Sequence, residues 1–123
     1  YGGSNLLGNT GSGDRNYICG SPRGVVIQAS QGSQPWLNSI RNTYFGVQPG
    51  PPVSGIFGQI PTCSIGVYLG EGALGTALGT DTAAGENLFS DCKQAVVLAS
   101  SASGSNSIRR CRFVRCGQPM DLN

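Results

Sequence analysis

A chain of 123 residues with 20 glycines and only 11% charged residues is a single domain with one modest hydrophobic core, residues 1–123. This composition excludes charge-rich disorder and long exposed helices, which need Glu and Lys on their solvent face. The net charge of +2 is too small to indicate a partner, and no apolar run approaches the ~20 residues of a membrane helix.

The cysteines and the scarcity of lysine predict a secreted, extracellular protein from an oxidising compartment. The sequence holds five cysteines, one lysine and no histidine. The alternative is an intracellular chain with buried thiols. In the secreted case four cysteines would pair and one would remain, and their spacing does not choose the pairing. The disulfide candidates are Cys19, Cys63, Cys92, Cys111 and Cys116. No positively charged leader precedes an apolar segment, so we expect any signal peptide to have been removed.

In chain order, the sequence predicts short strands separated by glycine-rich and proline-rich loops. Residues 1–13 form either a flexible arm or an edge strand, and residues 15–19 form a short strand. The three prolines between residues 49 and 52 place a loop at the surface. Residues 65–69 form another strand, in a third and more divergent unit. Residues 74–84 contain too much glycine for a stable helix, so the chain is all-β.

One sequence pattern occurs twice. Residues 25–45 and 96–113 both begin with Val-Val, continue through Ala-Ser and a polar loop, and reach an identical Asn-Ser-Ile-Arg step. Branched and aromatic residues around Gly, Ser and Pro are typical of hairpins, so we expect two repeated hairpin units that superpose. Matching positions predict these inward-facing side chains: Val26, Ile40, Val97, Ile108 and Phe113.

Two segments resemble the β-prism family of jacalin-related lectins and the vitelline membrane outer layer protein. Residues 32–45, GSQPWLNSIRNTYF, are similar to the last loop and strand of the lectins, with Asn38 where the lectins carry Asp. Residues 80–92, TDTAAGENLFSDC, are similar to the vitelline protein's repeat. The resemblance implies a disulfide-stabilised β-prism or sandwich that binds carbohydrate without catalysis.

The best candidate ligand site is the loop around the only tryptophan. An exposed indole stacks on the apolar face of a sugar, while short polar side chains and loop amides bind hydroxyls. The candidate ligand-binding residues are Gly32, Ser33, Gln34, Trp36 and Asn38. The alternative is that Trp36 fills the core of a small domain.

A second candidate is a run of arginines near the end of the chain. Arg109, Arg110, Arg112 and Arg115 would bind sulfates, carboxylates or phosphates if they share a strand face. The alternative is a solvated face near Asp91 and Asp121. Nucleic acid is not expected, because the net charge of the chain is low.

No pattern of catalytic residues is present. A serine nucleophile has no histidine base, and the acids share no recognisable frame, so no enzyme, cofactor or metal is expected. Three functions remain: a secreted lectin-like domain, an extracellular structural coat or matrix protein, and a small secreted microbial toxin or effector. The expected partner is a glycan or a component of the matrix or cell surface. An odd cysteine or an edge strand would allow an oligomer.

Overall fold

The computed structural model describes residues 5–8, 15–28, 38–47, 63–99 and 106–122. In these ranges the chain forms short strands and one 3-10 turn, η1 (Ala83–Gly85), and contains no α-helix. The strands make three sheets of four strands each, and every described strand pair is parallel. The all-β prediction is therefore confirmed.

Each sheet takes every third strand of the chain. Sheet A contains β1 (Leu6–Leu7), β4 (Ser39–Ile40), β7 (Ala77–Leu78) and β10 (Ser107–Ile108). Sheet B contains β2 (Asn16–Ile18), β5 (Thr43–Phe45), β8 (Asn87–Ser90) and β11 (Cys111–Val114). Sheet C contains β3 (Arg23–Ile27), β6 (Ile65–Leu69), β9 (Gln94–Leu98) and β12 (Gln118–Leu122).

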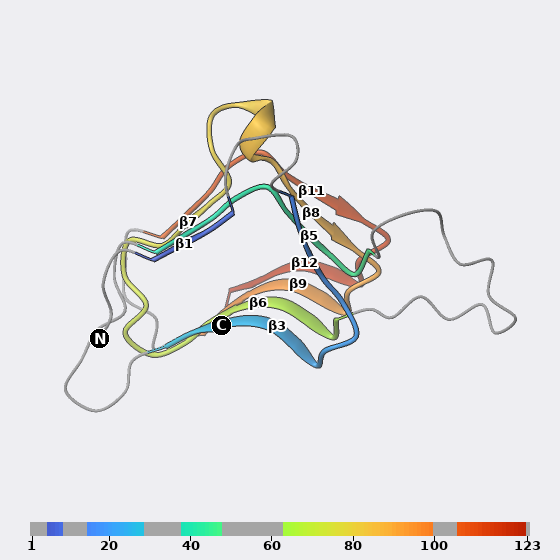
Figure 1. Cartoon of the computed structure of the whole chain (residues 1–123). Helices are drawn as coiled ribbons and strands as arrows, with labels where there is room; N and C mark the ends of the chain where they lie inside the picture. The colour runs from blue at the N-terminus through green and yellow to red at the C-terminus, as the bar shows by residue number, and fades with distance from the viewer. Residues whose placement is uncertain (1–4, 9–14, 29–37, 48–62, 100–105, 123) are drawn as a thin grey trace, which may run out of the picture.

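The chain thus passes through sheets A, B and C in turn and then starts the next round. One round is called a coil here: coil 1 is β1–β3, coil 2 is β4–β6, coil 3 is β7–β9 and coil 4 is β10–β12. The three sheets lie on the three sides of a triangular cross-section (Figure 1). Stacked coils with parallel sheets on their sides define a parallel β-helix.

The predictions of repeated hairpins, of a β-prism and of disulfide stabilisation are wrong. Residues 25–45 run from β3 through β4 to β5, which belong to three different sheets, so strands adjacent in this segment do not pair. All five cysteines are free thiols. Short strands separated by Gly and Pro look alike whether the next strand turns back or continues around a helix, which is why the pattern favoured hairpins.

The repeated sequence nevertheless marks equivalent places in the β-helix. Val25 and Val96 lie in one column of sheet C, both in register with Val67. Ile40 and Ile108 lie in one column of sheet A, both in register with Leu78. The matching residues are therefore two coils apart. Coils 1 and 2 correspond to coils 3 and 4.

The core is built from columns of side chains that continue from coil to coil. The most regular column is aromatic: Phe45 stacks on Phe89 with ring centroids 4.7 Å apart, and Phe89 stacks on Phe113 at 5.4 Å. The strand register places Ile18 at the coil 1 end of this column. Gly66 makes room for the stack, because a Cβ there would lie 2.6 Å from a Phe89 ring carbon.

Burial separates the middle coils from the terminal ones. Of the five residues expected to face inward, Ile40 and Val97 are buried and Phe113 packs against the core. Val26 and Ile108 are instead 41% and 36% exposed. Val26 lies in an outward-facing column of sheet C, in register with Tyr68, while its neighbours Val25 and Ile27 pack against the core. Ile108 shares the inward column of Ile40 and Leu78, but among the described residues coil 4 has a neighbouring coil on one side only, and this explains its exposure.

Buried asparagines tie the coils together where sheet A turns into sheet B. Asn87 is fully buried; its side-chain oxygen accepts the Thr43 N–H at 3.0 Å, and its amide nitrogen donates to the Ile40 carbonyl at 2.8 Å. The turn itself uses a left-handed residue, with φ of +50° at Asn42 and +46° at Arg110. Asparagine adopts this conformation more readily than most residues, so the Asn after Arg41 suits the turn.

Candidate functional site

The outer face of sheet B carries a column of one side chain from each coil. Tyr17 is in register with Tyr44, and Tyr44 is in register with Leu88. Arg112 continues the column in coil 4. The rings of Tyr17 and Tyr44 meet edge to face, with centroids 5.9 Å apart and planes inclined by 76°. The guanidinium carbon of Arg15 lies 4.2 Å from the centroid of Tyr44.

We call Tyr17, Tyr44 and Arg15 the tyrosine face. Tyr17 is 37% exposed, so its ring is accessible to solvent, while Arg15 covers part of Tyr44. Arg15 is held in place because its Nε donates to the Asn42 side-chain oxygen at 3.3 Å. An exposed phenol ring beside a positioned guanidinium offers an apolar surface and several hydrogen-bond donors within one coil spacing, about 4.8 Å.

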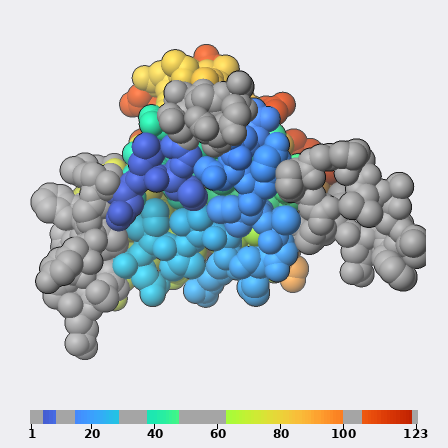
Figure 2. Space-filling view, viewed as in Figure 1, coloured from blue at the N-terminus to red at the C-terminus, as the bar shows by residue number. Residues whose placement is uncertain are grey.

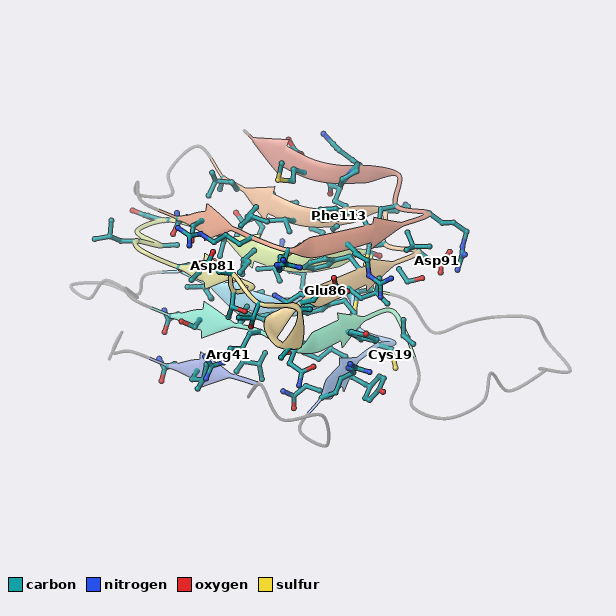
Figure 3. All side chains as sticks on the ribbon, turned by 90° about the horizontal axis from the view of Figure 1, so that it is seen from above. Cys19, Arg41, Asp81, Glu86, Asp91 and Phe113 are labelled. Atoms are coloured by element: carbon teal, nitrogen blue, oxygen red, sulfur yellow. The ribbon has the colours of Figure 1, made fainter. Side chains whose placement is uncertain are left out.

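The four arginines predicted as an anion site all contact groups of coil 3 or of the loop that contains η1. Three form ion pairs: Arg109 with Asp81 at 2.7 Å, Arg112 with Glu86 at 2.6 Å and Arg115 with Asp91 at 2.7 Å. Arg110 Nε donates to the Asp81 carbonyl at 2.8 Å. Asp81, Glu86 and Asp91 come from three separate places along coil 3 (Figure 3). The structure thus spreads the arginines over several acidic partners instead of converging them on one anion site.

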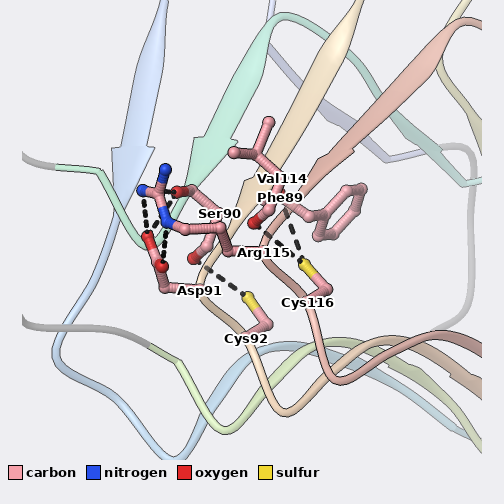
Figure 4. A network of polar contacts seen from close by, with 7 residues as sticks. All are labelled: Phe89, Ser90, Asp91, Cys92, Val114, Arg115 and Cys116. Carbon is pink, nitrogen blue, oxygen red and sulfur yellow. Dashed lines mark hydrogen bonds and ion pairs between the residues drawn. The ribbon is translucent and has the colours of Figure 1, made fainter.

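The tightest of these contacts lies at the turn from sheet B to sheet C (Figure 4). Arg115 Nε and Nη2 donate to the two carboxylate oxygens of Asp91 at 2.7 and 2.8 Å. Ser90 Oγ donates to Asp91 Oδ2 at 2.6 Å. The donors from Arg115, and then the one from Ser90, lower the pKa of Asp91, because they stabilise the charged form. The same ion pair raises the pKa of Arg115.

This pair predicts an acid-dependent loss of stability. Because the folded pKa of Asp91 lies below its ordinary value of 3.8, ionised Asp91 stabilises the fold above that value. The contribution is lost as the pH falls through the lowered folded pKa. The stability difference between wild type and Asp91→Asn should therefore be largest near neutral pH and shrink as the pH falls below 3.8. Urea unfolding of both proteins at a series of pH values measures this difference in the free energy of unfolding.

Asp81→Asn is the matched control, because Asp81 also pairs with an arginine but its side chain is 78% exposed. We expect a smaller stability change from Asp81→Asn, since exposed pairs contribute little. A stability difference for Asp91→Asn that stays constant from neutral to acidic pH would contradict the role assigned to this carboxylate.

Three cysteines mark the corner that precedes sheet C. Cys63, Cys92 and Cys116 each stand two residues before the first residue of β6, β9 and β12. Their thiols donate to backbone carbonyls: Cys63 to Ile18 at 3.6 Å, Cys92 to Ser90 at 3.7 Å and Cys116 to Phe89 at 3.4 Å. Figure 4 shows the last two side by side in adjacent coils.

Burial keeps the thiols of Cys63, Cys92 and Cys111 protonated. Desolvation raises the pKa of Cys92 to about 12, and nearby Cys116 raises it further. Desolvation also raises the pKa of Cys63 and Cys111. A protonated thiol is a poor nucleophile and a poor metal ligand, so Cys63, Cys92 and Cys111 pack as small apolar groups with weak donors. The described residues contain no group of three or more His, Cys, Asp or Glu that could hold a metal.

The predicted tryptophan loop falls mostly outside the described residues. Gly32, Ser33, Gln34 and Trp36 belong to residues 29–37, so their part in a ligand site stays a prediction. Asn38 is described and is only 6% exposed. Its side-chain oxygen accepts hydrogen bonds from the backbone and the side chain of Asn5, at 3.2 and 3.0 Å. In the structure Asn38 therefore joins coil 1 to coil 2.

The sequence reasoning missed the tyrosine face. Tyr17, Tyr44 and Arg15 stand in two segments that look unrelated along the chain, and only the parallel register brings them together. A usable signal was present: both tyrosines sit between polar or small residues and a following apolar residue, in the patterns Asn-Tyr-Ile and Thr-Tyr-Phe.

Comparison of the chain with protein-family models, with curated proteins and with solved structures finds no match. Among the described residues, no helix is long and apolar enough to cross a membrane. The fold assignment therefore rests on strand order and register, and function has to be argued from the chemistry of the surface.

Proposed function

We propose that this is a secreted, non-enzymatic carbohydrate-binding protein, and that the tyrosine face of sheet B takes part in sugar recognition. The observation that carries the proposal is the exposed Tyr17 ring, packed against Tyr44 in the next coil and flanked by Arg15. Sugars present an apolar ring face with hydroxyls around its edge. An aromatic ring next to fixed donors complements both features.

The positions of the donors support this proposal over a purely hydrophobic contact. The guanidinium of Arg15 is fixed by Tyr44 on one side and by Asn42 on the other, so little side-chain entropy would be lost on binding. The Arg112–Glu86 ion pair lies farther along the same column. Both members can exchange hydrogen bonds with hydroxyls, because an arginine donates and a carboxylate accepts.

Sugar binding is tested with a glycan array followed by titration of the strongest ligand. We expect Tyr17→Ala to weaken binding by about tenfold or more, since exposed aromatic side chains often dominate such contacts. Tyr68→Ala is the matched control: Tyr68 also has an arginine over its ring, Arg23 at 4.8 Å, but it lies on sheet C. Equal affinity of wild type and Tyr17→Ala would exclude the tyrosine face.

A Trp36→Ala variant in the same titration separates the two candidate sugar sites. Loss of binding in Trp36→Ala with retention in Tyr17→Ala would place the site in the tryptophan loop. No binding to any glycan by the wild-type protein would remove the proposal itself.

The second candidate function is a structural coat or matrix element. It is favoured by the ion pairs that cross from coil 4 to coil 3 or its loop, and by the continuous core columns, which together make a regular rod segment. No described contact favours the third candidate, a microbial toxin or effector. A protein that binds no glycan but resists proteolysis and denaturant would fit the structural role.

A further inference from the structure

The uncancelled positive charge of this chain belongs to coils 1 and 2 and to their loops. Residues 71–123 contain five basic and five acidic residues, so their charges cancel. The net charge of +2 therefore comes entirely from residues 1–70, which contain three arginines and a single acid, Asp14. The three arginines are Arg15, Arg23 and Arg41. An anionic ligand is attracted more strongly to this part of the molecule than to coils 3 and 4.

The ion pairs show the same division. All three that join described residues link an arginine of coil 4 to an acid of residues 81–91, at 2.6–2.7 Å. Within the described ranges, Arg15, Arg23 and Arg41 have no carboxylate partner, and Asp14 lies outside those ranges. The three arginines instead contact an aromatic ring or a backbone carbonyl. Their charge is therefore open to a carboxylate or sulfate from a ligand.

Of these three arginines, Arg15 is the one that lies on the tyrosine face. Its guanidinium is positioned by the Tyr44 ring, 4.2 Å from the centroid, and its Nε donates to the Asn42 side-chain oxygen at 3.3 Å. Arg15 is exposed, and no described group accepts a hydrogen bond from its two Nη nitrogens. The outer end of the guanidinium is thus held in place with its donors directed to no other described residue.

Two parallel N–H donors on a fixed guanidinium match the two oxygens of a carboxylate, and two of the oxygens of a sulfate. Acidic sugars carry such a group at the edge of the ring, where a neutral sugar carries a hydroxyl. The exposed ring of Tyr17 packs beside Tyr44 and offers the apolar surface for the sugar ring. Arg112, farther along the same column, does not offer an uncompensated charge, because Glu86 neutralises it.

We propose that the sugar recognised by the tyrosine face is acidic, and that Arg15 selects it by binding its carboxylate or sulfate. This inference rests on the proposed function, because it names the class of sugar that the same face binds. The apolar side of the sugar packs on Tyr17, and the anionic group accepts hydrogen bonds from the Nη nitrogens of Arg15. A neutral sugar makes the first contact and loses the charge-assisted part of the second.

The test compares acidic sugars with neutral counterparts of the same ring. Oligomers of galacturonate, glucuronate and mannuronate are titrated at neutral pH beside their methyl esters, which keep the ring and its hydroxyls and lose only the charge. Dextran sulfate beside dextran is the corresponding pair for a sulfate. Wild type should bind at least one acid about tenfold or more tightly than its neutral counterpart. Added salt should reduce this preference, because the site is exposed.

Arg15→Gln should remove the preference by weakening the acid about tenfold, with the affinity for the neutral counterpart unchanged. Arg15→Lys keeps the charge without the fork and should give an intermediate preference. Arg23→Gln is the matched control, because Arg23 is also exposed and lies over a tyrosine, Tyr68. Arg15 directly precedes β2 of sheet B, whereas Arg23 begins β3 of sheet C. Figure 2 looks onto coil 1, with described residues of β1, β2 and β3 spread across it.

Asp14→Asn removes the acid next to Arg15 in the sequence and should maintain or increase the preference. Equal affinity for acidic and neutral sugars, a preference that survives Arg15→Gln, or an equal loss in Arg23→Gln would each overturn the inference. Loss of the preference in Asp14→Asn would do the same. The proposed function would still stand if Tyr17→Ala abolished binding of the neutral sugar. A wild type that binds no glycan at all would remove both.

Discussion

Replacing Phe89 with alanine should lower the free energy of unfolding by about 3–5 kcal/mol, the range for truncating a buried aromatic side chain. Phe89 is fully buried and stacks on Phe45 and Phe113 at once, with planes inclined by 2° and 13°. Removing its ring opens a cavity between two coils and breaks the column in the middle. Urea or guanidinium unfolding, followed by circular dichroism, gives the value.

Phe113→Ala is the matched control, because Phe113 stands at the end of the same column and is only partly buried. It should cost distinctly less than Phe89→Ala, since less surface is buried and solvent can fill the space. Equal losses for the two variants would contradict the difference in burial between the middle and the end of this column.

Replacing Asn87 with alanine should destabilise the protein by about 1–3 kcal/mol. Asn87 is 0% exposed, and its loss leaves the Thr43 N–H buried without this partner, whereas the Ile40 carbonyl still accepts from the Gly79 N–H at 2.7 Å. Each buried group that loses its hydrogen bond costs about 1–3 kcal/mol. Thermal and denaturant unfolding of the variant measure the loss.

Asn106→Ala provides the comparison for Asn87→Ala. Asn106 makes a similar pair of bonds, accepting from the Thr76 N–H at 2.9 Å and donating to the Ala73 carbonyl at 3.1 Å, but it is only partly buried. Water can replace part of the hydrogen bonding of the Asn106 side chain, so the loss of stability should be smaller than for Asn87→Ala. A negligible loss at Asn87 would show that the turn between sheets A and B does not depend on the buried amide.

The sequence was sufficient to predict an all-β chain and the equivalence of distant segments. The shared Asn-Ser-Ile-Arg step marks Ile40 and Ile108 as members of one column, which the register confirms. The sequence could not show whether each next strand turns back to form a hairpin or continues into a different sheet. A strand as short as Ser39–Ile40 has no pattern that separates a hairpin from a turn between two sheets, and this choice depends on contacts with other coils.

The candidate surface was harder to predict for the same reason. Tyr17 and Arg15 lie far from Tyr44 in the chain, and the contact exists only because a coil brings the residues together. The cysteine count favoured disulfides, but the spacing of Cys63, Cys92 and Cys116 reflects a repeated position in the coil. A recurring structural position and a disulfide framework give similar spacings in sequence.

The central claim is that parallel coils, and not hairpins, build this protein, and NMR contacts between protons test it most directly. The account predicts contacts along the column of Phe45, Phe89 and Phe113 rings, and between the backbones of Tyr44 and Leu88. Strong contacts between α-protons of residues 25–27 and 39–45, the mark of antiparallel pairing, would contradict it.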